Sequence, residues 1–214
     1  MGAIAGIDLG TTYSALAALN AIGKPEIVPD LSGNRVVPSI VAFNGGDSVL
    51  VGVEAKNKLS SDPTNVVQFV KRMMSDPSHR YDIDGAAYSP VEISALILKK
   101  LKEECVQLGD IEDVVITVPA HFNEIERKST MDAGKIAGLN VLGVVNEPTA
   151  AAVYYASQAP ISGNVVVYDL GGGTFDVSIL ELGDGVFEVK STNGDTFLGG
   201  EDFDNAIVDY LVAE

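Results

Sequence analysis

Basic residues are scarce in this sequence. Its 214 residues include 14 Lys and Arg against 30 Asp and Glu, which gives a formal net charge of −16 at pH 7. Such an acidic excess argues against a surface for nucleic acids or for anionic membranes, because both are polyanions. A phosphate-rich small molecule would therefore have to be bound through a divalent cation and aimed backbone amides.

Cysteine is nearly absent, and long apolar runs are missing. The single Cys105 cannot form an intramolecular disulfide, which favours a reducing compartment, and its place in a helical pattern predicts a small buried side chain. The N-terminus lacks a basic region, and apolar runs such as residues 165–167 have the length of a strand rather than a membrane span. We therefore expect a cytoplasmic protein.

Two short segments are versions of each other. Residues 6–13 (GIDLGTTY) and 167–176 (VYDLGGGTFD) each contain an apolar strand ending in Asp-Leu-Gly, a tight turn with Gly and Thr, and a second strand. A glycine turn can present several backbone N–H groups to a phosphate, because no Cβ blocks the approach. One such turn is equally typical of an ordinary β-hairpin. A duplicated fold, however, places its two turns across one cleft, so the pair favours a phosphate site.

The rest of the sequence predicts strands first and helices later. Residues 4–51 contain short β-type runs separated by turn residues. Capping signals predict helix starts at 89–92, 123–126 and 147–148. Residues 75–88 are polar and are expected to be irregular.

A second group of strands, residues 165–192 with a turn at 183–185, precedes a last helix. With 46% hydrophobic residues the chain can form a real core. The order of elements predicts an α/β fold of two related lobes. We expect the first lobe to cover residues 1–162, with a tip subdomain at about 37–90, and the second, residues 163–214, to be incomplete.

Four ordered blocks resemble the signature motifs of DnaK-like heat-shock chaperones. They are residues 7–12 (IDLGTT), 146–152 (NEPTAAA), 169–176 (DLGGGTFD) and 198–204 (LGGEDFD). Together they are far more specific than one glycine motif, and the similarity spans the chain. The resemblance implies an actin-like, ribonuclease H-like ATPase fold that binds ATP or ADP with Mg²⁺ between two lobes. It also implies a chaperone that uses ATP hydrolysis to drive the binding and release of unfolded client peptides by a further C-terminal domain.

The resemblance assigns roles to the two motifs. Asp8 and Asp169 would hold Mg²⁺ mainly through its water shell, which suits an ion that sheds water reluctantly. The implied phosphate-binding residues are Gly10, Thr11, Thr12, Tyr13, Gly171, Gly172, Gly173, Thr174, Gly199 and Gly200.

Further residues are assigned by the same resemblance. Lys71 would contact the transferred phosphate and the attacking water, and Glu147 would orient water and couple the nucleotide state to the rest of the molecule. Pro119 and Arg127 would relay that state. From the residues alone, Lys71 is equally typical of a solvated helix face, Glu147 of a helix cap and Pro119 of a strand end. The implied catalytic groups are Asp8, Lys71, Glu147, Asp169 and Thr174.

The sequence also departs from the family pattern. The segment between Arg72 and Ser89 is shorter than usual, which predicts a tip subdomain without a hairpin, as in the short HscC-like bacterial branch. Gly143 stands where the family commonly has an arginine that contacts J-domain co-chaperones, so that contact is open, while a nucleotide exchange factor is still implied. His121 replaces a typical Tyr and is expected to be a packed or capping residue rather than a base.

The resemblance places adenine recognition and the completion of the second lobe beyond residue 214. We therefore expect a fragment that binds ATP weakly or not at all, is inactive alone, and self-associates through its unfinished sheet. Two alternatives share the actin-like fold: a relative of the sugar and acetate kinases, and a filament-forming protein. A kinase should show an Asp base near its cleft, and no such block stands out, whereas residues 146–152 favour the chaperone.

Overall fold

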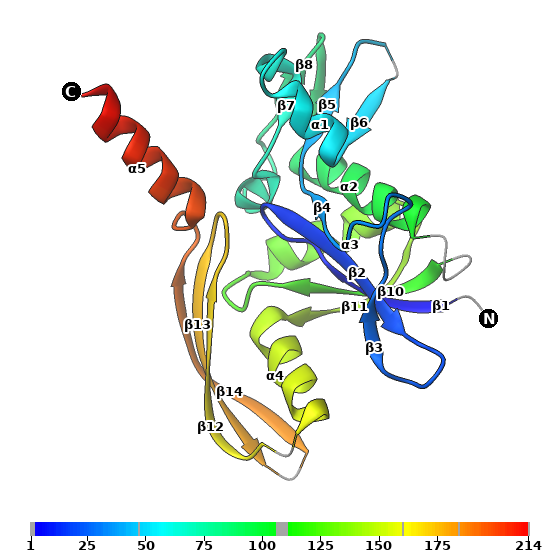
Figure 1. The fold of residues 1–214 in the computed structure, drawn as a ribbon, viewed down its shortest axis with the longest axis vertical. Coiled ribbons are helices and arrows are strands. Elements are labelled where there is room, and N and C mark those ends of the chain that lie inside the picture. The colour runs from blue at the N-terminus through cyan, green and yellow to red at the C-terminus, as the bar shows by residue number, and fades with distance from the viewer. Residues whose placement is uncertain (1–2, 47, 106–110, 160, 184, 214) are drawn as a thin grey trace. The chain divides into compact units, whose positions relative to one another are not determined.

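The computed structural model describes residues 3–46, 48–105, 111–159, 161–183 and 185–213. The chain folds into two compact units, each containing both sheet and helices (Figure 1). The first unit consists of Met1–Thr117 and Asn123–Val144, and the second consists of Val118–Phe122 and Val145–Glu214. The mixed α/β class predicted from the sequence is confirmed. Within the described residues, no helix is both long and apolar enough to cross a membrane.

A six-stranded sheet forms the centre of the first unit, in the order β11-β10-β1-β2-β3, with β4 paired to β2. Strand β1 runs parallel to β10 and antiparallel to β2. The alternating residues Ala5, Ile7 and Leu9 are buried, as the period of two in a strand predicts. The strands are β1 (Ala3–Asp8), β2 (Tyr13–Leu19), β3 (Pro25–Ile27), β4 (Val37–Pro38), β10 (Ile111–Val118) and β11 (Asn140–Asn146).

Helices α2 (Pro90–Glu104) and α3 (Glu124–Ile136) pack against each other beside this sheet. Both begin with the capping boxes that the sequence predicts, since the Ser89 and Asn123 side chains accept hydrogen bonds from the first turn. One face of α2 is fully buried in the core. Its largest core side chains are Ile93, Ile97, Leu98 and Leu101.

The tip of the first unit contains a small sheet and a hairpin. The elements are β5 (Val41–Phe43), β6 (Val49–Val51), α1 (Val53–Lys58), the 3₁₀ turn η1 (Pro63–Asn65), β7 (Val66–Val67), the 3₁₀ turn η2 (Val70–Met73), β8 (Tyr81–Ile83) and β9 (Ala86–Tyr88).

Strands β8 and β9 correct two predictions from the sequence. They pair as an antiparallel hairpin across Asp84 and Gly85, whose φ angles are 51° and 79°. Two consecutive positive φ angles are typical of a type I′ turn, for which Asp-Gly is a preferred sequence. The interpretation of residues 75–88 as irregular, and the expectation of a tip without a hairpin, are therefore wrong.

The second unit is a three-stranded meander in the order β12-β13-β14 with two helices. Helix α4 covers one face, where Ala152, Leu180 and Leu182 form a small core. Part of the predicted turn at 183–185 lies outside the described residues. The elements are α4 (Glu147–Gln158), β12 (Gly163–Leu170), β13 (Phe175–Gly183), β14 (Val186–Asp195) and α5 (Gly200–Val212).

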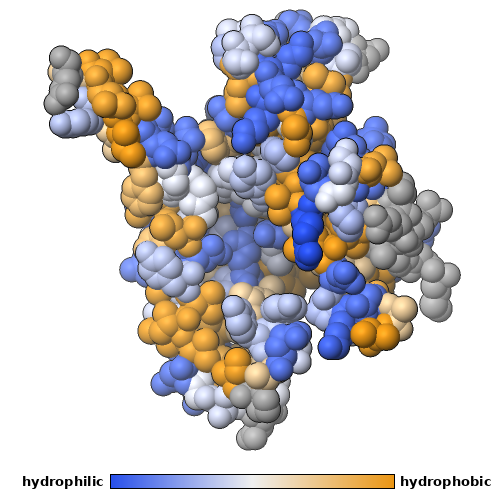
Figure 2. Space-filling model, viewed as in Figure 1, coloured by the Kyte–Doolittle hydropathy of each residue, from blue (hydrophilic) through white to orange (hydrophobic). Residues whose placement is uncertain are grey.

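The opposite face of this meander carries exposed apolar side chains. Val166 and Tyr168 are 63% and 65% exposed, and α5 has no buried residue among those described. Figure 2 shows the apolar surface that α5 presents. In the first unit, the positions that correspond to Val166 and Tyr168 in the duplicated motif are Ala5 and Ile7, which are buried.

Candidate functional site

The two predicted turns have the same strand register. Asp8 pairs with Ala15 across β1 and β2, and Asp169 pairs with Asp176 across β12 and β13. Each aspartate therefore faces the seventh residue after it, and in both units a four-residue turn, residues 9–12 and 171–174, joins the two strands. The predicted strand–turn–strand structure of both motifs is confirmed.

Ser39 stabilises the turn of the first unit through two hydrogen bonds. The Ser39 hydroxyl donates to the Gly10 carbonyl oxygen at 2.7 Å, and the Ser39 N–H donates to the Thr12 carbonyl oxygen at 2.8 Å. The Ser14 and Ser39 hydroxyls are also 2.9 Å apart and buried. A Cβ on Gly10 would overlap the Tyr13 carbonyl oxygen, so the tight closure of the turn requires glycine. The sequence analysis missed Ser39, which no local pattern connects to the turn.

Two hydroxyl groups of this turn have no hydrogen-bond partner among the described residues. They are Thr11 Oγ1 and Thr12 Oγ1, and both atoms are buried. An unsatisfied buried hydroxyl costs about 1–3 kcal/mol, so such groups in a native protein call for an explanation. A phosphate, which offers several acceptor oxygens, would satisfy both. This observation fits the predicted phosphate site.

Asp8 lies at the carboxyl end of β1, beside the same turn. The Thr117 hydroxyl donates to Asp8 Oδ1 at 3.0 Å from the neighbouring strand β10. An ionised carboxylate has about four acceptor positions, so one hydroxyl leaves capacity for the water shell of a cation. Among the described residues, no group of three or more His, Cys, Asp or Glu side chains is arranged to hold a metal ion directly.

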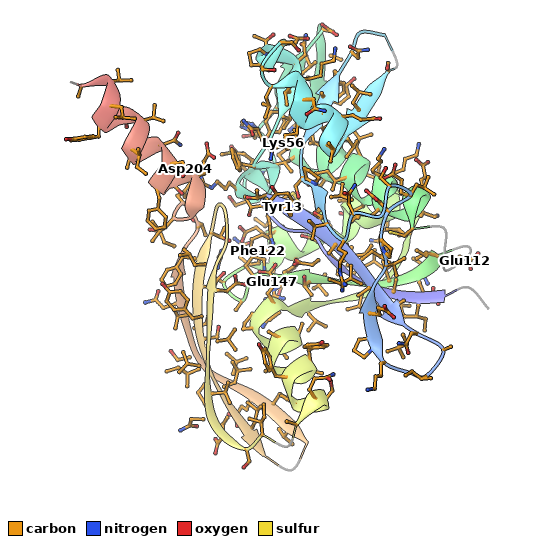
Figure 3. All side chains as sticks on the ribbon, viewed as in Figure 1. Tyr13, Lys56, Glu112, Phe122, Glu147 and Asp204 are labelled. Carbon is orange, nitrogen blue, oxygen red and sulfur yellow. The ribbon has the colours of Figure 1, made fainter. Side chains whose placement is uncertain are left out.

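Lys71 is buried, with 7% of its surface exposed. It lies in the 3₁₀ turn η2, which follows Phe69 in the left-handed region at φ 57°. Lysine is almost never this buried without compensating partners, because its ammonium group loses hydration. The alternative of a solvated helix face is therefore wrong. Tyr13 is exposed, and its ring lies 5.8 Å from Lys56 Nζ, so its side chain faces α1 (Figure 3).

In the second unit, the glycine turn and the start of α5 form one structure. The Gly200 N–H donates to the Gly171 carbonyl oxygen at 3.1 Å, and the Glu201 N–H donates to the Gly172 carbonyl oxygen at 3.0 Å. A Cβ on Gly199 would overlap the main chain of Gly172 and Gly173. The turn is closed by a 2.9 Å bond from the Gly171 N–H to the Thr174 carbonyl oxygen. Six predicted phosphate-binding residues are thus neighbours: Gly171, Gly172, Gly173, Thr174, Gly199 and Gly200.

Asp169 faces a second carboxylate that the sequence analysis did not count as a site residue. Asp176 lies directly opposite it on β13, is 3% exposed, and contacts His121 Nδ1 through Oδ1 at 2.7 Å. His121 also packs edge-on against Phe122, with ring centroids 5.6 Å apart. His121 is thus packed, as predicted, but it contacts a buried acid rather than capping a helix.

The remaining predicted residues lie at element ends or on helices. Glu147 is the first residue of α4 and is half-buried, a position where a carboxylate is stabilised by the helix dipole (Figure 3). Pro119 is buried directly after β10 in the second unit, and Arg127 is half-buried in α3 of the first unit. Gly143 lies in β11 with open space where a Cβ would stand.

Comparison with known families covers almost the whole chain. The sequence model of the Hsp70 protein family matches residues 4–83 and 75–214. The chain belongs to the Hsp70 family. Its two matched segments overlap at residues 75–83.

Membership of the Hsp70 family identifies a chaperone ATPase-type domain. For Hsp70 proteins in general it implies nucleotide binding with Mg²⁺, ATPase activity of the full-length protein, and client peptides and co-chaperones as partners. It favours the chaperone over the kinase and filament alternatives.

Proposed function

We propose that this chain is the N-terminal part of an Hsp70 ATPase domain that binds Mg-ATP between two lobes and hydrolyses it to drive client-peptide binding and release. The observation that carries the proposal is the pair of buried, unpartnered hydroxyls of Thr11 and Thr12 in the glycine turn of the first unit. A second glycine turn with the same preceding strand register supports it.

The two turns supply donors for the phosphates. In the first unit, the amides and hydroxyls of Thr11 and Thr12 bind phosphate oxygens, and Ser39 donates hydrogen bonds to the turn carbonyls of Gly10 and Thr12, which fixes the turn. In the second unit, residues 171–174 provide the donors. Gly199 packs against the main chain of this turn, and the Gly200 N–H donates a hydrogen bond to it. Backbone donors fixed in this way need no rearrangement when charge develops on the phosphate.

Five side chains act at the reaction centre in this proposal. Asp8 and Asp169 would hold Mg²⁺ through its water shell, and the ion would supply positive charge to offset that of the phosphates. The ammonium of Lys71 stabilises the charge that builds on the transferred phosphoryl group, and the Thr174 hydroxyl adds one donor. Glu147 orients water at the start of α4 and passes the nucleotide state on through Pro119 and Arg127.

The partners in this proposal are those that the family resemblance implies, and the location is the one expected from the single cysteine and the N-terminal sequence. We place the protein in the cytoplasm, with client peptides bound by a further C-terminal domain and a nucleotide exchange factor as partner. Gly143 has no side chain that could contact a J-domain co-chaperone, so such a contact would have to be made by other residues.

Substituting the unpartnered threonines tests the proposal. Thr11→Val and Thr12→Val keep the β-branched shape and remove only the hydroxyl. We expect each variant of the isolated chain to be as stable as the wild type or more stable in urea denaturation, because an unsatisfied polar group is removed. The same changes should weaken Mg-ATP binding about tenfold in a complete ATPase domain that contains this chain, because one hydrogen bond to an anion is lost.

Thr130→Val is the matched control. Its hydroxyl is buried but donates to the Glu126 carbonyl oxygen at 2.9 Å, so its removal should lower stability and leave nucleotide affinity unchanged. If Thr11→Val and Thr12→Val instead destabilise the chain and bind nucleotide normally, the hydroxyls are structural and the proposed phosphate site is wrong.

The isolated chain should bind ATP weakly or not at all and show no steady-state ATPase activity. The resemblance places the adenine pocket outside it, so most apolar contact with the nucleotide is missing. The exposed apolar side chains of β12 and α5 favour self-association. Calorimetry with Mg-ATP and light scattering measure both properties, and micromolar binding by a clean monomer would contradict the expectation.

A further inference from the structure

The contact between His121 and Asp176 joins two segments of the second unit that lie 55 residues apart in the sequence. His121 belongs to the short segment 118–122 after β10, and Asp176 is the second residue of β13. The Phe122 N–H donates to the Pro119 carbonyl oxygen at 3.2 Å, which folds the segment into a turn around His121. Val118, Pro119 and Phe122 are buried, so the imidazole is presented from an anchored turn.

Asp176 stands in the middle of a row across the three strands. It pairs with Asp169 on β12 and with Gly194 on β14. Directly opposed residues on antiparallel strands have Cβ atoms about 4.5–5.5 Å apart, and like charges so placed repel each other. A Cβ on Gly194 would approach Asp176 Oδ1 to 3.0 Å and would overlap the Phe175 carbonyl oxygen. The glycine therefore leaves the space in which the Asp176 carboxylate lies.

The covered face of β13 changes character along the strand. Leu180 and Leu182 pack in the core with α4, whereas Asp176 and Ser178, nearer the glycine turn, are buried and polar. The Ser178 hydroxyl is satisfied by Thr192 Oγ1 at 2.9 Å. If the Asp176 carboxylate is ionised, it can only accept hydrogen bonds, and His121 is then the donor through a proton on Nδ1 in this contact.

We propose that His121 is a positioning residue, which fixes the orientation of the Asp176 carboxylate through its Nδ1–H and so holds it apart from Asp169 beside the glycine turn. This inference rests on the proposed function, because it assigns the orientation of Asp176 to the nucleotide site. In the first unit, Ala15 occupies the corresponding place opposite Asp8. The second unit therefore has a carboxylate pair where the first has a single acid, and one member of the pair is oriented by His121.

The first experiment examines the isolated chain and is independent of nucleotide chemistry. Long-range ¹H–¹⁵N NMR correlation of the imidazole at pH 8 reports which nitrogen carries the proton in the neutral ring. We expect the Nδ1–H tautomer in the wild type and its loss in Asp176→Asn, where the acceptor charge is removed. A dominant Nε2–H tautomer in the wild type would overturn the inference and leave the proposed function standing.

The second experiment compares substitutions in a complete ATPase domain that contains this chain. The side-chain amide of His121→Asn reproduces a donor near the Nδ1 position, whereas that of His121→Gln reproduces one near Nε2, and His121→Phe has none. We expect His121→Gln and His121→Phe to lower kcat about 10-fold to 100-fold with KM within about threefold, and His121→Asn to restore most of kcat, because a misplaced group costs turnover more than binding.

If all three variants keep the wild-type kcat, His121 only packs and the proposal is overturned. Equal losses in all three, including His121→Asn, would do the same, because positioning by an Nδ1 donor requires the rescue. If the wild-type domain itself hydrolyses no ATP, the proposed function fails, while the tautomer measurement still decides the contact.

Discussion

Gly199 lies directly against the main chain of Gly172 and Gly173, with no room for even one methyl group. Its φ of −168° is extended backbone that any residue can adopt, so the restriction is purely steric. The start of α5 and the glycine turn are thus positioned by each other, and a side chain at Gly199 must separate them.

Gly199→Ala should therefore destabilise the second unit by about 1–3 kcal/mol, the usual cost of overpacking. Urea denaturation measures the loss, and amide exchange should accelerate at residues 200–201, whose N–H groups bond to the turn. Gly143→Ala is the matched control, because nothing lies within 4 Å of a Cβ at that position. Equal stability of the two variants would show that the turn yields without cost.

Lys71→Ala should nearly abolish ATP hydrolysis in a complete ATPase domain that contains this chain, while ATP binding is largely retained. The charge of Lys71 matters most as the phosphoryl group departs, so kcat falls more than affinity. Thr174→Ala should cause a smaller loss, since the backbone donors of residues 171–173 stay in place. Single-turnover hydrolysis with labelled ATP measures both, and a larger loss for Thr174→Ala would reverse the assigned roles.

Asp8→Asn combined with Asp169→Asn should weaken Mg²⁺-dependent nucleotide binding more than either change alone. Both carboxylates act on the water shell of one ion in the proposed site, so their effects are coupled. Titrations of nucleotide at several Mg²⁺ concentrations measure this coupling. Additive effects that ignore Mg²⁺ would mean that the aspartates only support the turns, as Asp8 does with Thr117.

Cys105 gives a prediction on pH. Burial, followed by the charges of Asp30 and Glu104, raises the pKa of its thiol to about 11 from 9.0. Because the folded-state pKa is raised, the stabilisation is fully present below about pH 9 and is lost as pH rises from about 9 to 11. A stability profile over this window should fall less steeply in Cys105→Ala than in the wild type. Reaction with a thiol reagent at pH 8 should be slow until urea unfolds the chain, and fast labelling of the folded chain would contradict the buried thiol.

Local patterns predicted the parts of the fold that are set by nearby residues. The Asp-Leu-Gly turns, the capping boxes at Ser89 and Asn123, and the start of α4 at Glu147 are all found in the structure. The Asp84-Gly85 pair is a strong signal for the β8–β9 turn, and in the structure it outweighs the polar composition around it, which is typical of an irregular segment.

Contacts between distant residues could not be predicted in this way. Ser39 bonds to Gly10 across 29 positions and His121 to Asp176 across 55, and neither pair belongs to a repeating pattern. The burial of Lys71 depends on how the 3₁₀ turn η2 packs in the first unit, which periodicity does not report. The roles of the site residues stay predictions that rest on the family and on the geometry of each turn.

The parallel pairing of β1 with β10 has a consequence during synthesis. Asp8 meets Thr117 only after 109 further residues have been made, which takes about 5–20 s at the usual rates of translation. Over that interval β1 and β2 can form their hairpin, but the edge of β1 that will bond to β10 has no partner, and Ala5 and Ile7 lack most of their core. The meander of β12, β13 and β14 has no such delay, because each strand pairs with the next to leave the ribosome. We therefore expect the nascent first unit to need more protection from aggregation during synthesis than the second unit of this chain.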